Sequence, residues 1–191
     1  MLFRSGSVPT LCARNLGSSP ILIPDGSTLV GCKQNRVVNV SILLPPKTST
    51  PIPVSCVERG RWQFETRQFS PGGGSDRKLR ARMCQEATAG LLERRRVEVD
   101  QLAVWSHVDE VLGAAGVAAP TAAYHEVHAQ RRSSMKSYQK AFPYPGGACG
   151  VAMLLDGSVE GVDLFDAAST LESLWEDLVL GYAVHEIGRA H

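Results

Sequence analysis

The 191-residue sequence predicts an α+β fold with a β-rich N-terminal half, central helices, and a C-terminal β-hairpin followed by a helix. Short apolar runs separated by turn residues fill the first 70 positions, a pattern typical of strands. Helical periodicity replaces them between positions 76 and 142. An Asp-Gly pair at 156–157 then joins two strand-like runs ahead of a last amphipathic segment. Because strands and helices do not alternate, a parallel doubly wound sheet is disfavoured.

The N-terminal strands are expected at residues 8–14, 21–23, 37–44 and 52–57. Pro51 and Pro53 indicate that the last run is an edge strand or begins at the margin of a sheet, because proline has no N–H to donate to a β-ladder. Residues 70–75, Ser-Pro-Gly-Gly-Gly-Ser, have the composition of a flexible linker.

Two central helices and a hairpin–helix unit are expected next. Asp100 is a suitable N-cap for a helix that ends near Gly116, and a second helix is expected over residues 120–142. A two-residue turn at 156–157 would place Asp163 opposite Gly150, where the glycine leaves room beside the carboxylate. The last helix has one apolar face, formed by Leu171, Leu174, Trp175, Leu178 and Tyr182.

Composition and cysteine spacing exclude several classes of protein. The formal net charge of +1 disfavours a broadly basic nucleic-acid-binding protein, and no apolar run is long enough for a membrane helix. The five cysteines include no Cys-x-x-Cys pair, so neither a zinc ribbon nor a thioredoxin-like site is expected. No apolar targeting segment follows the first residue, so reduced thiols in a cytoplasmic protein are the simplest interpretation. The sequence specifies no cofactor.

Residues 1–185 are expected to form a single domain, because a chain of this length usually folds as one. The last six residues, Glu-Ile-Gly-Arg-Ala-His at 186–191, read like the translation of a common sequencing adapter, so we expect a non-native tail. A genuine polar tail is the alternative.

The most informative stretch is a polar run that enters the strand predicted at 37–44. Its polar side chains are those of Lys33, Gln34, Asn35, Arg36 and Asn39. If the run is extended, Lys33, Asn35 and Asn39 share one face. A lysine and two amides on one face offer several donors to an anion or a polar ligand. A solvated strand face is the alternative.

A second polar group surrounds a glycine turn at residue 60. Glu58 and Arg61 flank this turn, so they can pair with each other or with a ligand. Trp62 is expected to seal the sheet by burial, with stacking on a base as the alternative. Cys56 alternates with apolar residues and is expected to be a buried thiol.

A basic segment and a pair of histidines are interpreted as structural features rather than as binding sites. Seven basic residues between 77 and 96 are interspersed with glutamates and predict a solvated helical face, with phosphate or nucleic-acid binding as the alternative. His125 and His128 lie three residues apart with no third ligand indicated, so no metal site is predicted.

The two polar stretches closely resemble a known family, the ADP-ribosylglycohydrolase- and rhodanese-phosphatase-superfamily-associated proteins. The resemblance is carried by GCKQNRVVNVSILLPP at 31–46, IPVSCVERGRW at 52–62, DQLAVW at 100–105 and GVDLFD at 161–166, and it spans roughly residues 8–182. The chain departs from the family pattern at Ser27 and Thr28, where members usually carry an acidic pair, and at Cys32, which replaces an alanine. Members also carry a further N-terminal segment, so an N-terminally truncated domain is expected.

The resemblance implies a link to NAD or ADP-ribose metabolism, because the family is named for enzymes that remove ADP-ribose. We therefore expect a cytoplasmic domain that handles a nucleotide or ADP-ribose-type phosphate-bearing ligand, and the sequence leaves open whether it is an enzyme. The residues expected to bind this ligand are Lys33, Gln34, Asn35, Arg36, Asn39 and Arg61. Glu58 and Asp163 are the acid–base candidates. The alternative is a non-catalytic interaction module that docks onto a hydrolase or phosphatase partner through the same strand face.

Overall fold

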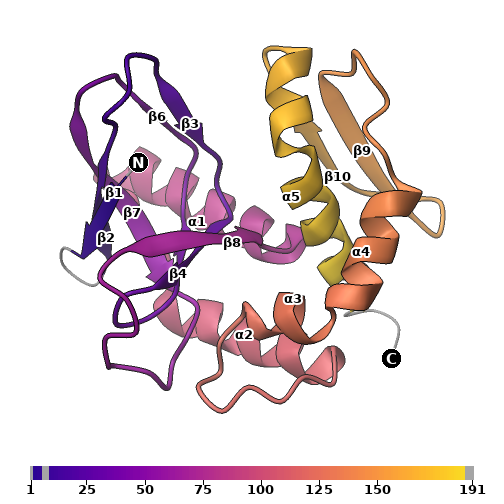
Figure 1. The fold of residues 1–191 in the computed structure, drawn as a ribbon, viewed down its shortest axis with the longest axis horizontal. Helices are drawn as coiled ribbons and strands as arrows, with labels where there is room; N and C mark the ends of the chain where they lie inside the picture. The colour runs from indigo at the N-terminus through magenta and orange to yellow at the C-terminus, as the bar shows by residue number, and fades with distance from the viewer. Residues whose placement is uncertain (1, 6–8, 188–191) are drawn as a thin grey trace.

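The computed structural model describes residues 2–5 and 9–187, and it confirms the α+β fold class (Figure 1). The strands are β1 (Leu2–Ser5), β2 (Thr10–Arg14), β3 (Ile21–Ile23), β4 (Ser27–Gly31), β5 (Arg36–Val38), β6 (Ile42–Leu44), β7 (Ser49–Cys56), β8 (Phe69–Gly74), β9 (Gly150–Leu155) and β10 (Ser158–Leu164). The helices are α1 (Arg77–Arg94), α2 (Gln101–Ala114), α3 (Glu126–Gln130), α4 (Arg132–Ala141) and α5 (Ala168–Ile187). None of the helices in the described part of the chain has the length and hydropathy needed to span a lipid bilayer.

Two lobes are visible in Figure 1. The N-terminal lobe contains β1–β8, and the C-terminal lobe contains β9, β10, α4 and α5. Buried apolar side chains form one cluster among the strands of the N-terminal lobe and another between α5 and the β9–β10 hairpin. A third cluster joins the sheet to α1, α2 and the end of α5, so the two lobes share part of their core.

β7 lies inside a six-stranded antiparallel sheet of order β1-β2-β7-β5-β4-β8, so the edge-strand alternative predicted from its prolines is wrong. The Pro53 carbonyl accepts a hydrogen bond from the Asn39 N–H, on the side of β7 that faces away from β2. Within a strand, the N–H and C=O of one residue point to the same side. The N–H that Pro53 lacks would therefore also face away from β2. β5 pairs only with residues 54–56, and the prolines therefore precede its ladder.

The polar run forms a hairpin turn, so the condition under which Lys33, Asn35 and Asn39 would share one strand face is not met. β4 ends at Gly31, and the backbone reverses there through Gly31 and Cys32, whose φ angles are +124° and +51°. The Asn35 side chain stabilises this turn, because its Oδ1 accepts a hydrogen bond from the Gly31 N–H at 2.9 Å. β5 then starts at Arg36 and pairs with β4.

Residues 70–75 are not a linker, because most of them belong to the edge strand β8, which pairs with β4. Glycine allows close packing here rather than flexibility. A Cβ at Gly74 would lie 2.5 Å from the backbone oxygen of Asp177, and a Cβ at Gly181 would lie 2.5 Å from that of Ser75. The end of β8 therefore packs directly on the backbone of α5, which places Ser75 at the boundary between the lobes.

The helix predicted after Asp100 is confirmed as α2, and the Asp100 carboxylate accepts the Leu102 N–H as an N-cap. The helix predicted at 120–142 is instead divided into α3 and α4, which are preceded by an irregular segment. In that segment Ala123 forms an isolated β-bridge with Glu58. Pairing with the chain after β7 thus holds the start of the predicted helix in a non-helical conformation.

The β9–β10 hairpin is confirmed, but its register differs from the expected one. A bulge between Val159 and Gly161 inserts one residue, so Asp163 lies opposite Val151 rather than Gly150. The apolar face predicted for the last helix is also confirmed, since its five residues all pack in the cluster beneath the hairpin.

Candidate functional site

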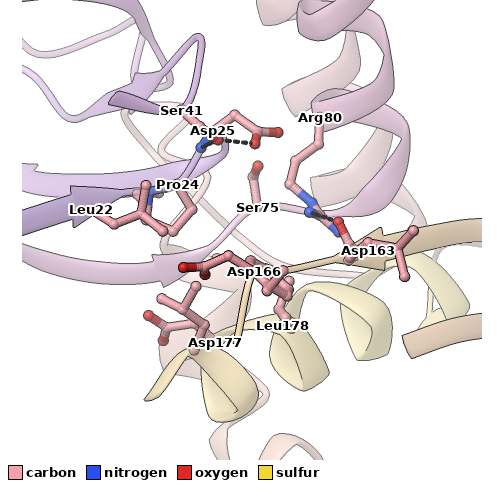
Figure 2. A pocket seen from close by; sticks show the side chains of 15 residues that line it. Leu22, Pro24, Asp25, Ser41, Ser75, Arg80, Asp163, Asp166, Asp177 and Leu178 are labelled. Carbon is pink, nitrogen blue, oxygen red and sulfur yellow. Dashed lines mark hydrogen bonds and ion pairs between the residues drawn. The ribbon is translucent and has the colours of Figure 1, made fainter. Parts of the chain in front are cut away.

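A pocket of about 310 Å³ lies at the boundary between the two lobes and is called the interlobe pocket below. Side chains from the two lobes face each other across it (Figure 2). Its polar lining residues are Asp25, Ser27, Ser41, Ser75, Arg80, Asp163, Asp166 and Asp177. Four aspartates and one arginine give this lining a formal charge of −3. A pocket of this charge attracts cations and hydroxyl groups and repels free anions.

A buried ion pair forms one wall of the pocket. Arg80 of α1 donates two hydrogen bonds to the carboxylate of Asp163 on β10, at 2.7 and 2.9 Å, and the Tyr182 hydroxyl donates a third. Burial by itself raises the pKa of Asp163, but the hydrogen bonds and charge of Arg80 outweigh it, so this pKa lies below its usual value. Asp163 is therefore an ionised carboxylate, and Arg80 has its charge matched within the protein.

The other three aspartates come from three separate segments. Ser41 Oγ donates to Asp25 at 2.7 Å, and Thr170 Oγ1 donates to Asp166 at 2.9 Å, so both carboxylates are oriented by neighbouring hydroxyls. Partial desolvation raises the pKa of Asp177, and the charge of Glu176 raises it further. The pocket thus presents carboxylates with pKa values moved in opposite directions.

Ser75 supplies a buried hydroxyl that the protein does not use. Its side chain is 1% exposed, and among the described residues its Oγ has no hydrogen-bond partner. The backbone is fixed nearby, because the Ser75 N–H donates to the Gly26 carbonyl at 2.8 Å. Figure 2 shows the Ser75 side chain between Asp25 and Arg80. An unpaired buried hydroxyl costs about 1–3 kcal/mol, so Ser75 Oγ is a candidate partner for a ligand or a water.

Glu58 lies outside this pocket, at the centre of a separate buried network. Its carboxylate accepts hydrogen bonds from Arg61 Nε at 2.9 Å and from a second Arg61 nitrogen at 2.6 Å. The Asn35 N–H and the Thr121 hydroxyl donate to it at 3.0 and 2.8 Å. Burial raises the pKa of Glu58, but these four donors together lower it below its usual value. The geometry therefore describes an ionised carboxylate that organises the fold.

Asn35 and Arg61 extend the same network. Asn35 Oδ1 accepts from Arg61 at 3.1 Å as well as from the Gly31 N–H, and Arg61 also donates to the Cys32 carbonyl at 2.6 Å. The Asn35 amide nitrogen contacts His125 Nδ1 at 3.0 Å. Asn35, Glu58 and Arg61 therefore join the β4–β5 turn, the chain after β7 and the start of α3.

The remaining predicted ligand-binding residues are dispersed. Arg36 and Gln34 are buried and hydrogen-bonded to each other at 3.1 Å, with Arg36 Nε and Gln34 Nε2 unpaired among the described atoms. Asn39 is buried beside a different groove. Lys33 is exposed, with its Nζ 5.0 Å from the centre of the Phe64 ring.

Of the eight predicted site residues, the structure brings Asn35, Glu58 and Arg61 into one network, and Arg36 adjoins it by donating to the Asn35 carbonyl at 3.3 Å. It places only Asp163 at the interlobe pocket. The expected burial of Trp62 is wrong, because its side chain is 58% exposed beyond the network, whereas Cys56 is buried as predicted.

Asp25, Ser75, Arg80 and Asp177 were not singled out as pocket residues by the sequence. Arg80 belongs to the basic segment predicted as a solvated face, which is accurate for the exposed Arg82–Glu86 and Arg94–Glu98 pairs but wrong for this buried residue. Asp177 lies three residues after Leu174 and just before Leu178 of the apolar face. A carboxylate there is also typical of the solvated margin of an amphipathic helix, so it gave no specific signal for a pocket.

The family model described as the ARG and Rhodanese-Phosphatase-superfamily-associated Protein domain, ARPP-1, matches residues 2–191. The chain belongs to the ARPP-1 family. Nothing among the curated proteins or the solved structures matches it. Ser27 of this ARPP-1 domain lines the interlobe pocket and occupies one of the two positions where the resemblance led us to expect an acidic residue. One of the three expected departures, Ser27, therefore lies at the interlobe pocket, whereas Thr28 and Cys32 do not line it.

Proposed function

We propose that this ARPP-1 domain binds a nucleotide or ADP-ribose-type ligand in the interlobe pocket, with the sugar hydroxyls held by the pocket carboxylates and Ser75. One observation carries the proposal: a buried, unpaired serine hydroxyl adjoins a small pocket walled by four aspartates. Ionised carboxylates accept hydrogen bonds only, so they pair with hydroxyl donors, while the serine can both donate and accept.

The size and apolar lining of the pocket support a ligand of this kind. Its volume of about 310 Å³ is close to the lower end of small-molecule sites, which span about 300–1,000 Å³. Leu22, Pro24 and Leu178 provide apolar surface against which a sugar or base can pack. Because Arg80 is already paired with Asp163, the ligand phosphates are expected to lie outside the acidic walls.

Two further considerations define the proposal. The family is named for its association with ADP-ribosylglycohydrolases, which supports an ADP-ribose-linked ligand. The five cysteines are free thiols, in agreement with a cytoplasmic location.

Within the proposal, Asp163 acts as a hydrogen-bond acceptor or base, since its pKa is lowered. Glu58 has no assigned contact with the ligand, because protein donors occupy its oxygens.

Ser75→Ala is expected to weaken ADP-ribose binding by about tenfold, equivalent to about 1.4 kcal/mol, without lowering the melting temperature. The reason is that Ser75 Oγ has no described partner within the protein, so its removal relieves an unpaired polar group in the free protein. Isothermal titration calorimetry with ADP-ribose and NAD, beside thermal melts, measures both quantities. Ser173→Ala, on an exposed part of α5, is the matched control and should bind as the wild type does.

A docking module remains the second candidate, and one observation favours it. The β9–β10 hairpin has an outward face with exposed apolar side chains at Leu154, Val159, Val162 and Leu164. Such a face can pack against a hydrolase or phosphatase partner. The polar run is poorly suited to docking, because most of its side chains are buried. Absence of binding heat with both ADP-ribose and NAD would reject the ligand proposal in favour of this module.

A further inference from the structure

A second pocket, of about 420 Å³, lies between the edge strand β8 and the helices α3 and α4. It shares no lining residue with the interlobe pocket, although both touch β8. Its polar side chains are those of Ser70, His125, His128, Arg132, Lys136 and Gln139. The lining contains two permanent cations and no carboxylate, which is opposite in charge to the interlobe pocket.

Arg132 and Lys136 lie four residues apart on α4, and both side chains line this pocket. Neither forms a salt bridge with any carboxylate that the structure describes, whereas Arg61, Arg80 and Arg94 each do. Two like charges at this helical spacing destabilise a helix by a few tenths of a kcal/mol. An unmatched pair of this kind at a concave surface is suited to an anion.

His125 adds an oriented donor to the same pocket. Asn35 Oδ1 already accepts two hydrogen bonds, so the Asn35 amide N–H₂ donates to His125 Nδ1. Neutral His125 therefore carries its proton on Nε2. The nearest carboxylate oxygen to that nitrogen, on Glu126, is 3.7 Å away, beyond hydrogen-bond distance, and Glu126 does not line the pocket. The His125 N–H thus remains available to a ligand.

We propose that this second pocket binds the phosphoryl group of a small molecule through Arg132, Lys136 and His125. Arginine and lysine together provide a planar fork and a point charge, the usual partners of phosphate oxygens. Burial lowers the pKa of His128, whose Nε2 donates to the Gly74 carbonyl at 3.1 Å, so this ring forms a neutral wall. The site is independent of ligand binding in the interlobe pocket.

The test is calorimetric titration of the full chain with inorganic pyrophosphate in a phosphate-free buffer. Arg132→Gln and Lys136→Gln are each expected to weaken binding by about tenfold or more, since each removes a charge-assisted contact. Lys140→Gln is the matched control, because Lys140 is exposed on the same helix and does not line the pocket. Lys140→Gln and Ser75→Ala should both bind pyrophosphate with an affinity within about twofold of the wild-type value.

Several results would overturn this site. Absence of pyrophosphate binding by the wild-type chain would do so, as would full affinity in Arg132→Gln and Lys136→Gln. An equal loss in Lys140→Gln, or tighter binding of a single-stranded oligonucleotide than of pyrophosphate, would assign the charges to a general polyanion surface. A loss in Ser75→Ala would place the phosphate in the interlobe pocket instead. Failure of ADP-ribose to bind leaves this result unaffected, so the two proposals fail separately.

Discussion

Asp76→Ala is expected to lower the free energy of unfolding by about 4 kcal/mol, a large part of the 5–15 kcal/mol typical of a domain. Asp76 is 1% exposed, and its carboxylate caps α1 by accepting the Leu79 N–H at 3.1 Å. It also accepts hydrogen bonds from His107 Nε2 at 2.9 Å and from the Tyr124 hydroxyl at 3.1 Å. Removing it leaves a buried imidazole and a buried hydroxyl without their acceptor.

Asp100→Ala is the matched control for this prediction. Asp100 is also an aspartate N-cap, but it is exposed and has no buried histidine partner. Its loss should cost about 1 kcal/mol, the usual value of a cap. Chemical denaturation measures the free energy of unfolding of both variants, and the difference between the two values is the contribution of the buried network. Equal destabilisation of the two variants would show that His107 and Tyr124 contribute nothing beyond the cap.

Arg61→Ala is expected to destabilise the domain by about 3 kcal/mol near neutral pH, because it leaves the buried Glu58 carboxylate without its bidentate partner. The pKa of Glu58 is lowered in the folded protein. The stability that this ion pair provides is therefore present above the unfolded pKa of about 4.3 and is lost as the pH falls through the lower folded value. The difference between variant and wild type should shrink below about pH 4.

Arg59→Ala, two residues away, is the control for the Arg61 variant. Arg59 pairs with Asp109 at 3.1 Å, but both side chains are about half exposed, so its removal should cost less than about 1 kcal/mol. Urea titrations at several pH values measure both variants. A destabilisation by Arg61→Ala that matches the control, or that does not change with pH, would contradict the structural role assigned to Glu58.

The sequence predicted the local elements well because their signals are local. The Asp-Gly turn, the Asp100 cap and the apolar face of α5 each depend on residues within one or two turns of each other. The errors come from contacts between distant segments. The glycines of β8 have the composition of a linker, yet Gly74 allows a close approach to α5, about 100 residues later in the chain, and Gly72 allows one to β4.

The candidate site residues show the same difference between local signals and contacts of distant segments, and they show it more strongly. Asn35 and Glu58 lie in stretches that the sequence marks as polar, but their partners Arg61, Thr121 and His125 convert them into a buried network. Asp163 was predicted as a site residue from the space around its hairpin. Its pairing with Arg80, 83 residues earlier, has no signal in a single sequence. The bulge that sets its register is similarly a property of the folded hairpin.

The most direct test of the interlobe pocket as the ligand site is a titration of the full chain with ADP-ribose, followed by amide nitrogen–proton NMR. The proposed function predicts that the largest shift changes fall at Asp25, Ser75, Asp163 and Asp177, which line that pocket from both lobes. No change at these four residues at saturating ligand would contradict it, whether or not the phosphate-binding residues of α4 shift.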